Sequence, residues 1–180
     1  MDRTEIYIIL AGEINAESVK RLSVAIFDPQ FVSAQDVHLQ VHSNGGMISD
    51  GIAMYNLLQG IPQNLITYNI GDVSSIAVLP YLAGETRRAS KSSLFMIHKA
   101  LGGMPPGNKV EAFQSAIDLF KINNNRIETI IGSKVSLTKA QRKIHADRDL
   151  YISATDAVRC SLATEIAEWR LPAGAKLFTL

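Results

Sequence analysis

Two adjacent serines, Ser74 and Ser75, lie where a strand-like run (65–70) gives way to an apolar run (76–82) typical of a buried helix. A serine at such a junction presents its hydroxyl beside backbone N–H groups that have no partner within the helix. This arrangement suits a nucleophile that must stabilise an oxyanion after it attacks a carbonyl carbon. It equally suits a helix-capping serine, which is the commoner role, so further residues must support the chemistry.

A catalytic serine requires a base that accepts its proton, an acid that orients the base, and donors for the oxyanion. Of the four histidines, His98 alone ends an apolar strand-like run just before a glycine-rich segment. His98 is therefore the favoured base, although a histidine at a strand end is more often only a hydrogen-bonded surface residue. The candidate acids are Asp72, Asp147 and Asp149, and the pattern of residues does not choose among them.

A glycine pair provides the candidate oxyanion donors. Gly45 and Gly46 follow a strand-like run at 37–41, and glycine allows the backbone to approach a ligand closely. A plain turn explains this pair equally well. The glycine pair and the serine pair both come where a predicted strand ends and a predicted helix begins. In parallel sheets, functional groups gather at such ends, so the two signals support each other.

Strand-like and helix-like segments alternate along the chain, which predicts parallel βαβ units and an α/β fold in a single domain over 1–180. Apolar runs or period-two alternation predict strands at 6–10, 37–41, 65–70 and 93–98, with a short extended piece at 147–152. Helices are predicted at 15–27, 48–58, 76–82 and 137–144, and the longest at about 110–131.

Composition narrows the class of protein. The 180 residues are 47% hydrophobic and 19% charged, enough apolar residues for a packed core. A net charge of +1 without a basic block argues against nucleic acid as a partner. The apolar runs are far shorter than the roughly 20 residues of a membrane span, and the N-terminus lacks a signal-peptide pattern. We therefore expect no membrane association and a cytoplasmic location. Cys160 is the only cysteine, so no disulfide, metal centre or cofactor is expected.

Four segments, in this order, resemble those of the ClpP peptidases. They are a glycine-rich segment (HSNGGMISDGIA, 42–53), a nucleophile segment (GDVSSIA, 71–77), a histidine segment (MIH, 96–98, followed by LGG, 101–103) and an aspartate segment (DRDLYISA, 147–154). The similarity extends over about 6–167, nearly the whole chain. None of the four segments would identify the family alone, but together and in order they do.

The resemblance implies a fold and a chemistry. The fold would be the superhelix of stacked ββα units that ClpP shares with the crotonases. The activity would be that of a Ser-His-Asp peptidase, with Ser75 as nucleophile, His98 as base and Asp149 as orienting acid. Backbone N–H groups of Gly46 and Ile76 would form the oxyanion hole. The substrate backbone would pair with an extended strand, so the substrate-binding residues would be Gly45, Leu101, Gly102 and Gly103.

The resemblance also implies an assembly. Family members enclose their active sites in a homo-oligomeric ring, a heptamer or double heptamer, in which peptides or unfolded proteins are cleaved. The long helix at about 110–131 would be the handle along which two rings meet. His38 and Gln40 stand where the family has aromatic residues that dock an ATPase, and few residues precede the first strand to form axial gate loops. Tight coupling to an ATPase partner is therefore not expected.

Several residues depart from the family pattern and leave alternatives open. Asn44 replaces a proline, Lys99-Ala100 replaces Gln-Pro, and Pro80 lies inside the predicted helix. These changes fit a catalytically inactive ring scaffold, although the serine, histidine and aspartate are all retained. A crotonase-type acyl-CoA enzyme would use the same fold and two backbone N–H groups. A serine–lysine peptidase would take Lys91 or Lys99 as its base. Acyl-CoA turnover would identify the crotonase alternative, and a ring without serine reactivity the scaffold.

Overall fold

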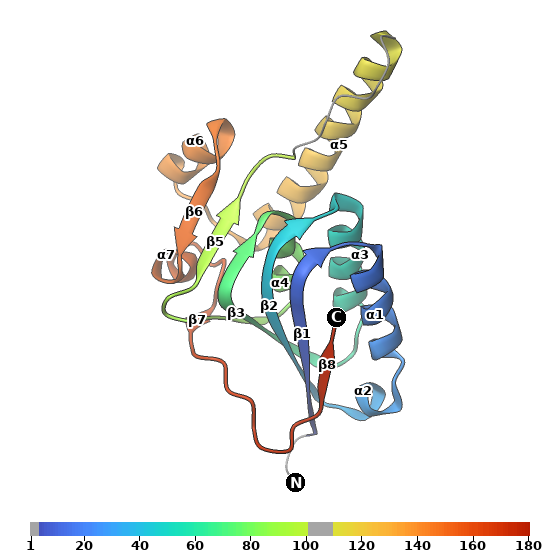
Figure 1. Cartoon of the computed structure of the whole chain (residues 1–180). Helices are drawn as coiled ribbons and strands as arrows, with labels where there is room; N and C mark the ends of the chain where they lie inside the picture. The colour runs from blue at the N-terminus through green and yellow to red at the C-terminus, as the bar shows by residue number, and fades with distance from the viewer. Residues whose placement is uncertain (1–3, 101–109) are drawn as a thin grey trace.

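The computed structural model describes residues 4–100 and 110–180. A twisted sheet runs through the molecule, with helices packed on one side and at one end (Figure 1). Along its main path the strand order is β6-β5-β3-β2-β1-β8, and β4 pairs with β3 and β7 away from that path. The strands are β1 (Glu5–Ile14), β2 (Asp36–Gly46), β3 (Asn64–Ser74), β4 (Thr86–Ala89), β5 (Leu94–Ile97), β6 (Leu150–Ser153), β7 (Glu165–Ile166) and β8 (Leu177–Thr179).

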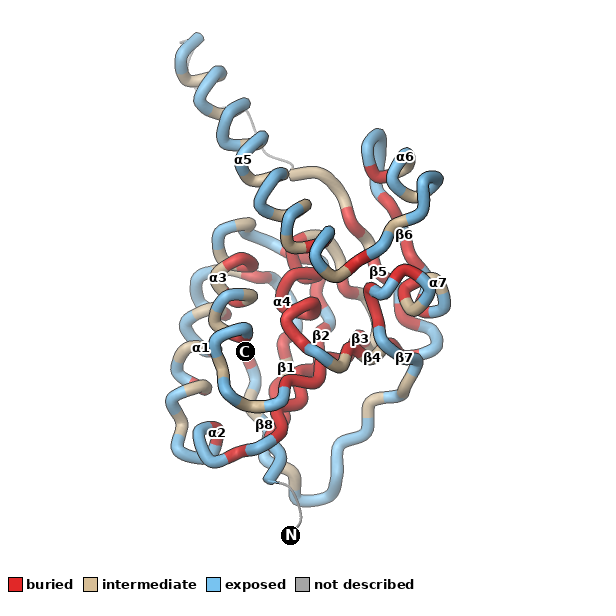
Figure 2. Tube along the Cα trace, turned by 180° about the vertical axis from the view of Figure 1, so that it is seen from behind, coloured by how far each residue is buried: buried red, intermediate tan, exposed pale blue. Residues whose placement is uncertain are grey.

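The helices follow the strands in the alternation that the sequence predicts. The long α5 projects away from the body of the molecule, and most of its outer part is exposed (Figures 1 and 2). The helices are α1 (Ala16–Ile26), α2 (Pro29–Ser33), α3 (Ile48–Gln59), α4 (Val78–Leu82), α5 (Val110–Lys134), α6 (Lys139–Asp147) and α7 (Ala154–Arg159), with a 3₁₀ turn, η1 (Ser75–Ala77), before α4.

Parallel pairing, as predicted, joins β1, β2 and β3, whereas β5 and β6 are antiparallel. The long β3 changes neighbour along its length, pairing first with β4 and then, over its last three residues, with β5. Asn69 lies at this change. Its side chain donates to the Leu94 carbonyl (2.8 Å) and accepts from the Gly71 N–H (3.0 Å). Since Asn69 is fully buried, these bonds fix the point at which β5 joins β3.

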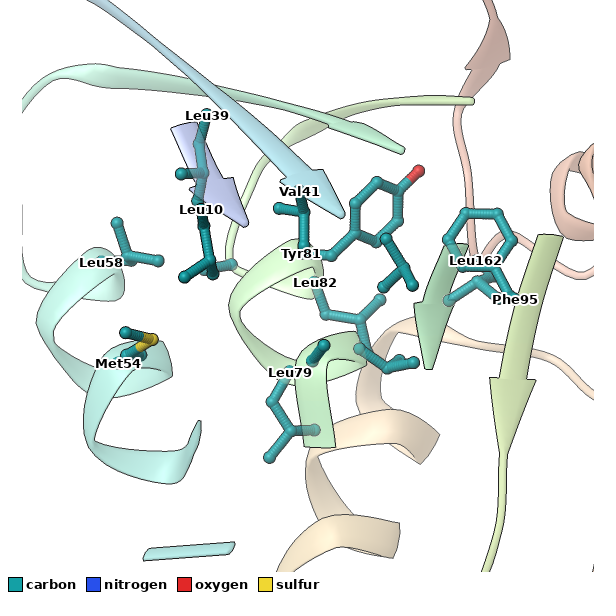
Figure 3. Packing of buried hydrophobic residues seen from close by; sticks show 14 of the residues in the cluster. Leu10, Leu39, Val41, Met54, Leu58, Leu79, Tyr81, Leu82, Phe95 and Leu162 are labelled. Atoms are coloured by element: carbon teal, nitrogen blue, oxygen red, sulfur yellow. The ribbon is translucent and has the colours of Figure 1, made fainter. Parts of the chain in front are cut away.

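The core surrounds α4, which is apolar on every side. Leu79, Tyr81 and Leu82 of α4 are fully buried, between Met54 of α3 and Phe95 of β5 (Figure 3). A helix that is hydrophobic all round must be buried in this way. The predicted helix over 76–82 is in fact divided into η1 and α4. Pro80 therefore falls in the first turn of α4, where a missing N–H removes no bond within that helix.

Local signals predicted helix starts well where a side chain caps the backbone. Asn15 accepts from the Ser18 N–H, while Ser18 Oγ accepts from the Asn15 N–H, a reciprocal capping box that begins α1. The predicted start of the helix at 137–144, which would make Ser136 its cap, is wrong, because α6 begins at Lys139. Thr138 is the cap instead and forms a capping box with Gln141. Because α6 then continues to Asp147, the extended piece predicted at 147–152 begins only at Leu150. The elements α2, β4, β7 and β8 were not predicted.

His38 and Gln40 of β2 are buried, whereas the period-two alternation at 37–41 predicts a half-buried strand, so that prediction was wrong. His38 stacks on Tyr7 (ring centroids 4.6 Å apart), and Trp169 contacts both Tyr7 and Tyr68 edge-on. The C-terminal segment that carries Trp169 thus covers the second face of the sheet before β8 pairs with β1 (Figure 1). No helix within the described ranges is long and apolar enough to cross a membrane.

A hydrogen-bond chain fixes the tautomer of His38. Arg88 Nη1 donates to Tyr68 Oη (2.7 Å), and Tyr68 Oη lies 2.9 Å from His38 Nδ1. Arginine can only donate, so the arrangement that uses the Tyr68 hydroxyl proton has Tyr68 donating to Nδ1, with the proton of the neutral ring on Nε2. Burial lowers the pKa of His38, and Arg88 adds to this, while Glu5 and Asp36 oppose it.

We predict that the free energy of unfolding decreases as the pH falls below about 6.5, which is the ordinary pKa of a histidine side chain. The unfolded chain takes up the proton first because the folded pKa of His38 is lower. The stabilising contribution is therefore complete above about pH 6.5 and is lost as pH falls toward the folded pKa. Urea unfolding at a series of pH values checks this. In His38→Gln the free energy of unfolding should depend less steeply on pH. In His42→Gln, which changes an exposed residue of the same strand, the dependence on pH should stay as in the parent. Equal slopes in His38→Gln and the parent would contradict the prediction.

Candidate active site

Ser75 occupies the turn from β3 into η1 with an unusual backbone conformation. Its φ is 57°, in the left-handed region that residues other than glycine seldom adopt. Such a conformation costs on the order of 1–3 kcal/mol and persists only where its surroundings impose it. The Ser75 side chain is part-exposed, at the junction predicted from the sequence.

His98 lies one residue beyond β5, and the pairing of β5 with β3 brings it to Ser75. Ser74 of β3 pairs with Met96 of β5, so both chains leave the ladder side by side. His98 Nε2 is 2.6 Å from Ser75 Oγ. The other ring nitrogen, Nδ1, is buried and has no hydrogen-bond partner among the residues that the structure describes. The structure thus brings together two of the three predicted triad residues.

The glycine pair lies against Ser75 and β1. A Cβ atom at Gly45 (φ +100°) would lie 2.7 Å from Ser75 Cβ, so glycine is required for this approach. A Cβ atom at Gly46 would overlap the carbonyl oxygen of Ile14 in β1. That oxygen accepts from the Met47 N–H (2.8 Å), which holds the turn that follows the pair.

One cavity of about 130 Å³ connects Ser75 and His98 with the two predicted oxyanion residues. Gly46, Ser75, Ile76 and His98 all line it, as the oxyanion assignment requires. The Ile76 N–H lies in the first turn of η1, where backbone donors lack partners within the helix. The rest of the lining is mostly apolar, from β5 and the helices: Ile48, Ile97, Lys99, Ala100, Ile127 and Ile131.

Asp149 stands apart from this cavity. It is exposed between α6 and β6 and lines a separate depression with Arg148 and Tyr151. Among the described residues, no hydrogen bond joins it to His98. Asp147 is likewise exposed at the end of α6, and the Asp72 backbone N–H donates to His42 Nδ1 (3.1 Å). None of the three candidate acids contacts the base here. Leu101, Gly102 and Gly103, predicted to bind substrate, lie outside the described residues.

Sequence reasoning missed an ion-pair network beside the cavity. Glu128 of α5 accepts from Lys99 Nζ and from His145 Nε2 of α6, both at 2.6 Å. The sequence suggests Lys99 only as a departure from the family pattern and as an alternative base. Its bond to the Glu128 carboxylate argues against the role of base. The three residues are far apart in the chain, so no local pattern could have joined them.

Comparisons with known proteins identify the family and the fold of this chain. The family model described as Clp protease matches residues 3–170. Among solved structures, a mutant of ClpP1 from Listeria monocytogenes superposes with a TM-score of 0.78 and 23% sequence identity, covering 91% of this chain and 92% of that chain. That structure has the same fold, and at 23% identity the similarity is evidence for the fold alone. The family match extends over most of the sequence, so the chain belongs to the Clp protease family.

Proposed function

We propose that this protein is a serine endopeptidase in which Ser75 is the nucleophile and His98 the general base. The observation that carries the proposal is the 2.6 Å contact between Ser75 Oγ and His98 Nε2 at the mouth of a cavity. His98 takes the Ser75 proton as Oγ attacks a peptide carbonyl, and the Gly46 and Ile76 N–H groups stabilise the oxyanion. His98 then protonates the leaving amine, and water hydrolyses the acyl-enzyme.

The protonation of His98 decides whether this chemistry can start. For Nε2 to accept the Ser75 proton, Nδ1 must carry the proton of the neutral ring. No described residue bonds to Nδ1, which is buried, and a buried unsatisfied donor costs about 1–3 kcal/mol. An acid on Nδ1 would remove this cost and select the productive tautomer. We keep Asp149 in that role, which requires the segment between α6 and β6 to bring it to His98 when substrate binds.

Substrates would be peptides or unfolded proteins cut after apolar residues. The isoleucines that line the cavity beside Ser75 come from four different elements. Lys99, the one lysine, arginine or carboxylate among the described lining residues, is paired with Glu128. A buried apolar side chain before the scissile bond would gain binding free energy there, and an acidic one would lose its hydration without a partner. Gly45, with residues 101–103, would hold the substrate backbone.

Turnover of short fluorogenic peptides tests the proposal. We predict that kcat/KM with leucine or methionine before the scissile bond exceeds that with aspartate by roughly 10- to 100-fold. Ser75→Ala is the control and should show no turnover with either peptide. Equal turnover of both peptides would refute the apolar preference. No turnover of any peptide by folded, assembled protein would refute the peptidase.

The proposed assembly is a homo-oligomeric ring. The projecting α5 carries exposed apolar residues that a partner could bury, in keeping with a handle between rings: Val110, Ile117, Leu119 and Ile122. Sedimentation velocity would test this, because a monomer at micromolar concentration would contradict it. We propose neither a cofactor nor an ATPase partner, and we place the protein in the cytoplasm.

An inactive ring scaffold is the second candidate function. The specific observation in its favour is the unpartnered Nδ1 of His98, with Asp149 exposed away from it. A scaffold subunit would assemble into rings and leave Ser75 unreactive. The intact contact between Ser75 and His98 is the reason to rank the peptidase first.

A further inference from the structure

A single carboxylate oxygen ties together three segments next to the proposed active site. Glu128 Oε1 accepts from Lys99 Nζ, which follows the catalytic histidine, and from His145 Nε2 on α6. His145 is 5% exposed, so one arm of this network is buried. Burial works to raise the pKa of Glu128, but the bonds and charges of Lys99 and His145 outweigh it and lower the pKa. Glu128 is therefore an anion at neutral pH.

Asn124 makes a second contact from the same face of α5. It precedes Glu128 by four residues, and side chains four apart lie one above the other on a helix. Its Oδ1 accepts from the Ala100 N–H at 2.8 Å. The helix thus holds both residues that follow His98, one through a side chain and one through the backbone.

Among the described residues, few hydrogen bonds hold the imidazole of His98. The last ladder pair of β5 joins Ile97 to Leu150, so His98 already lies beyond the sheet. Within residues 4–100 and 110–180 its ring makes one hydrogen bond, to Ser75, and Nδ1 makes none. The position of the ring relative to Ser75 therefore depends on where α5 places residues 99 and 100.

The charge of Glu128 has a separate consequence. Lys99 lines the same cavity as Ser75 and His98. As His98 takes the serine proton it becomes a cation, and an unpaired lysine nearby would oppose that charge. Glu128 compensates the lysine and so favours the imidazolium that the proposed reaction requires.

We propose that Glu128 and Asn124 are positioning residues, which hold His98 against Ser75 through Lys99 and Ala100. This inference rests on the proposed function of Ser75 and His98. Through His145, Glu128 also restrains α6, the helix that leads to Asp149. The two residues act on His98 in different ways. Asn124 affects only the position of the ring, whereas Glu128 affects both its position and its electrostatic surroundings.

Phosphonylation of Ser75 by a fluorophosphonate, in which Oγ displaces fluoride from phosphorus, is followed against pH by intact mass and provides the first readout. In Glu128→Gln the rate at high pH should fall by on the order of 10- to 100-fold because the ring is misplaced. The midpoint of its pH profile should move to lower pH because Lys99 is left uncompensated. Adding Lys99→Met should return the midpoint toward that of the parent. Asn124→Ala should lower the rate without moving the midpoint, and Asn124→Asp, which keeps the acceptor oxygen, should restore the rate.

Imidazole ¹⁵N resonances of His98, assigned with His98→Gln, provide a readout that does not need activity. They should show the same shift of the titration midpoint in Glu128→Gln. Glu111→Gln, on the exposed first turn of the same helix, is the matched control. Parent-like rates and His98 resonances in folded Glu128→Gln would overturn the inference. A parent protein that does not react with the fluorophosphonate would instead refute the peptidase, and the resonances would still decide the role of Glu128.

Discussion

Replacing Gly46 with alanine will unfold or severely destabilise the protein and eliminate its activity. The new Cβ would overlap the carbonyl oxygen of Ile14, and it would lie 2.9 Å from the Ile14 N and C atoms. These are backbone atoms of a buried strand, which cannot turn aside as a flexible side chain can. We expect a loss of about 2–5 kcal/mol in the free energy of unfolding. Any folded fraction should lose a further factor on the order of 10²–10³ in rate because an oxyanion donor is displaced.

Gly132→Ala is the matched control for this experiment. A Cβ atom at Gly132, near the end of α5, would meet nothing within 4 Å. In a helix, alanine is more favourable than glycine by about 1 kcal/mol, so this variant should be as stable as the parent or slightly more stable. Urea unfolding and peptide turnover measure both effects. A folded Gly46→Ala variant with parent-like turnover would show that the pair of N–H donors is placed wrongly.

Replacing His98 with alanine will lower kcat for peptides by on the order of 10⁶-fold, the loss found when one member of a coupled serine–histidine pair is removed from a serine peptidase. The reason is that Nε2, 2.6 Å from Ser75 Oγ, is the only base in contact with that hydroxyl among the described residues. The KM should change little because the imidazole acts on the proton rather than on substrate binding. His42→Ala, an exposed histidine beside the glycine pair, should change kcat by less than about tenfold.

The kinetics of the same variant also discriminate between bases. If Lys99 were the base, His98→Ala would keep most of the activity and Lys99→Met would lose it. The short bond from Lys99 to Glu128 predicts the opposite result. A fall in kcat of less than tenfold in His98→Ala would contradict the assignment of the base.

Much of the fold could be predicted because its signals are local. Asn15 caps α1 with its own side chain, and the alternation of strands and helices from β1 to β3 is visible in short windows. Elements that depend on distant contacts were missed. The three-residue β8 exists because it pairs with β1 from the other end of the chain, and His38 is buried because Trp169 covers the sheet near it. No window of sequence contains either contact.

The candidate site, like the fold, could be predicted only where its signals are local or belong to a family segment. Ser75 and His98 were predicted from their junctions and from the order of four family segments, and the β3–β5 pairing brings them together. The aspartate segment predicts which residue is the acid but not where α6 and β6 place it, and Asp149 is exposed. The Glu128 network joins residues 17 and 29 positions apart through one oxygen, and only the packing of α5 brings them into contact.

The most direct test of the central claim is fluorophosphonate labelling of the folded, assembled protein, with the labelled residue identified by peptide mapping. We predict that Ser75 carries the label. Ser74→Ala should be labelled as the parent is, while Ser75→Ala and His98→Ala should not be labelled. No label on Ser75, in protein shown by sedimentation to form rings, would contradict the peptidase and leave the inactive scaffold as the function.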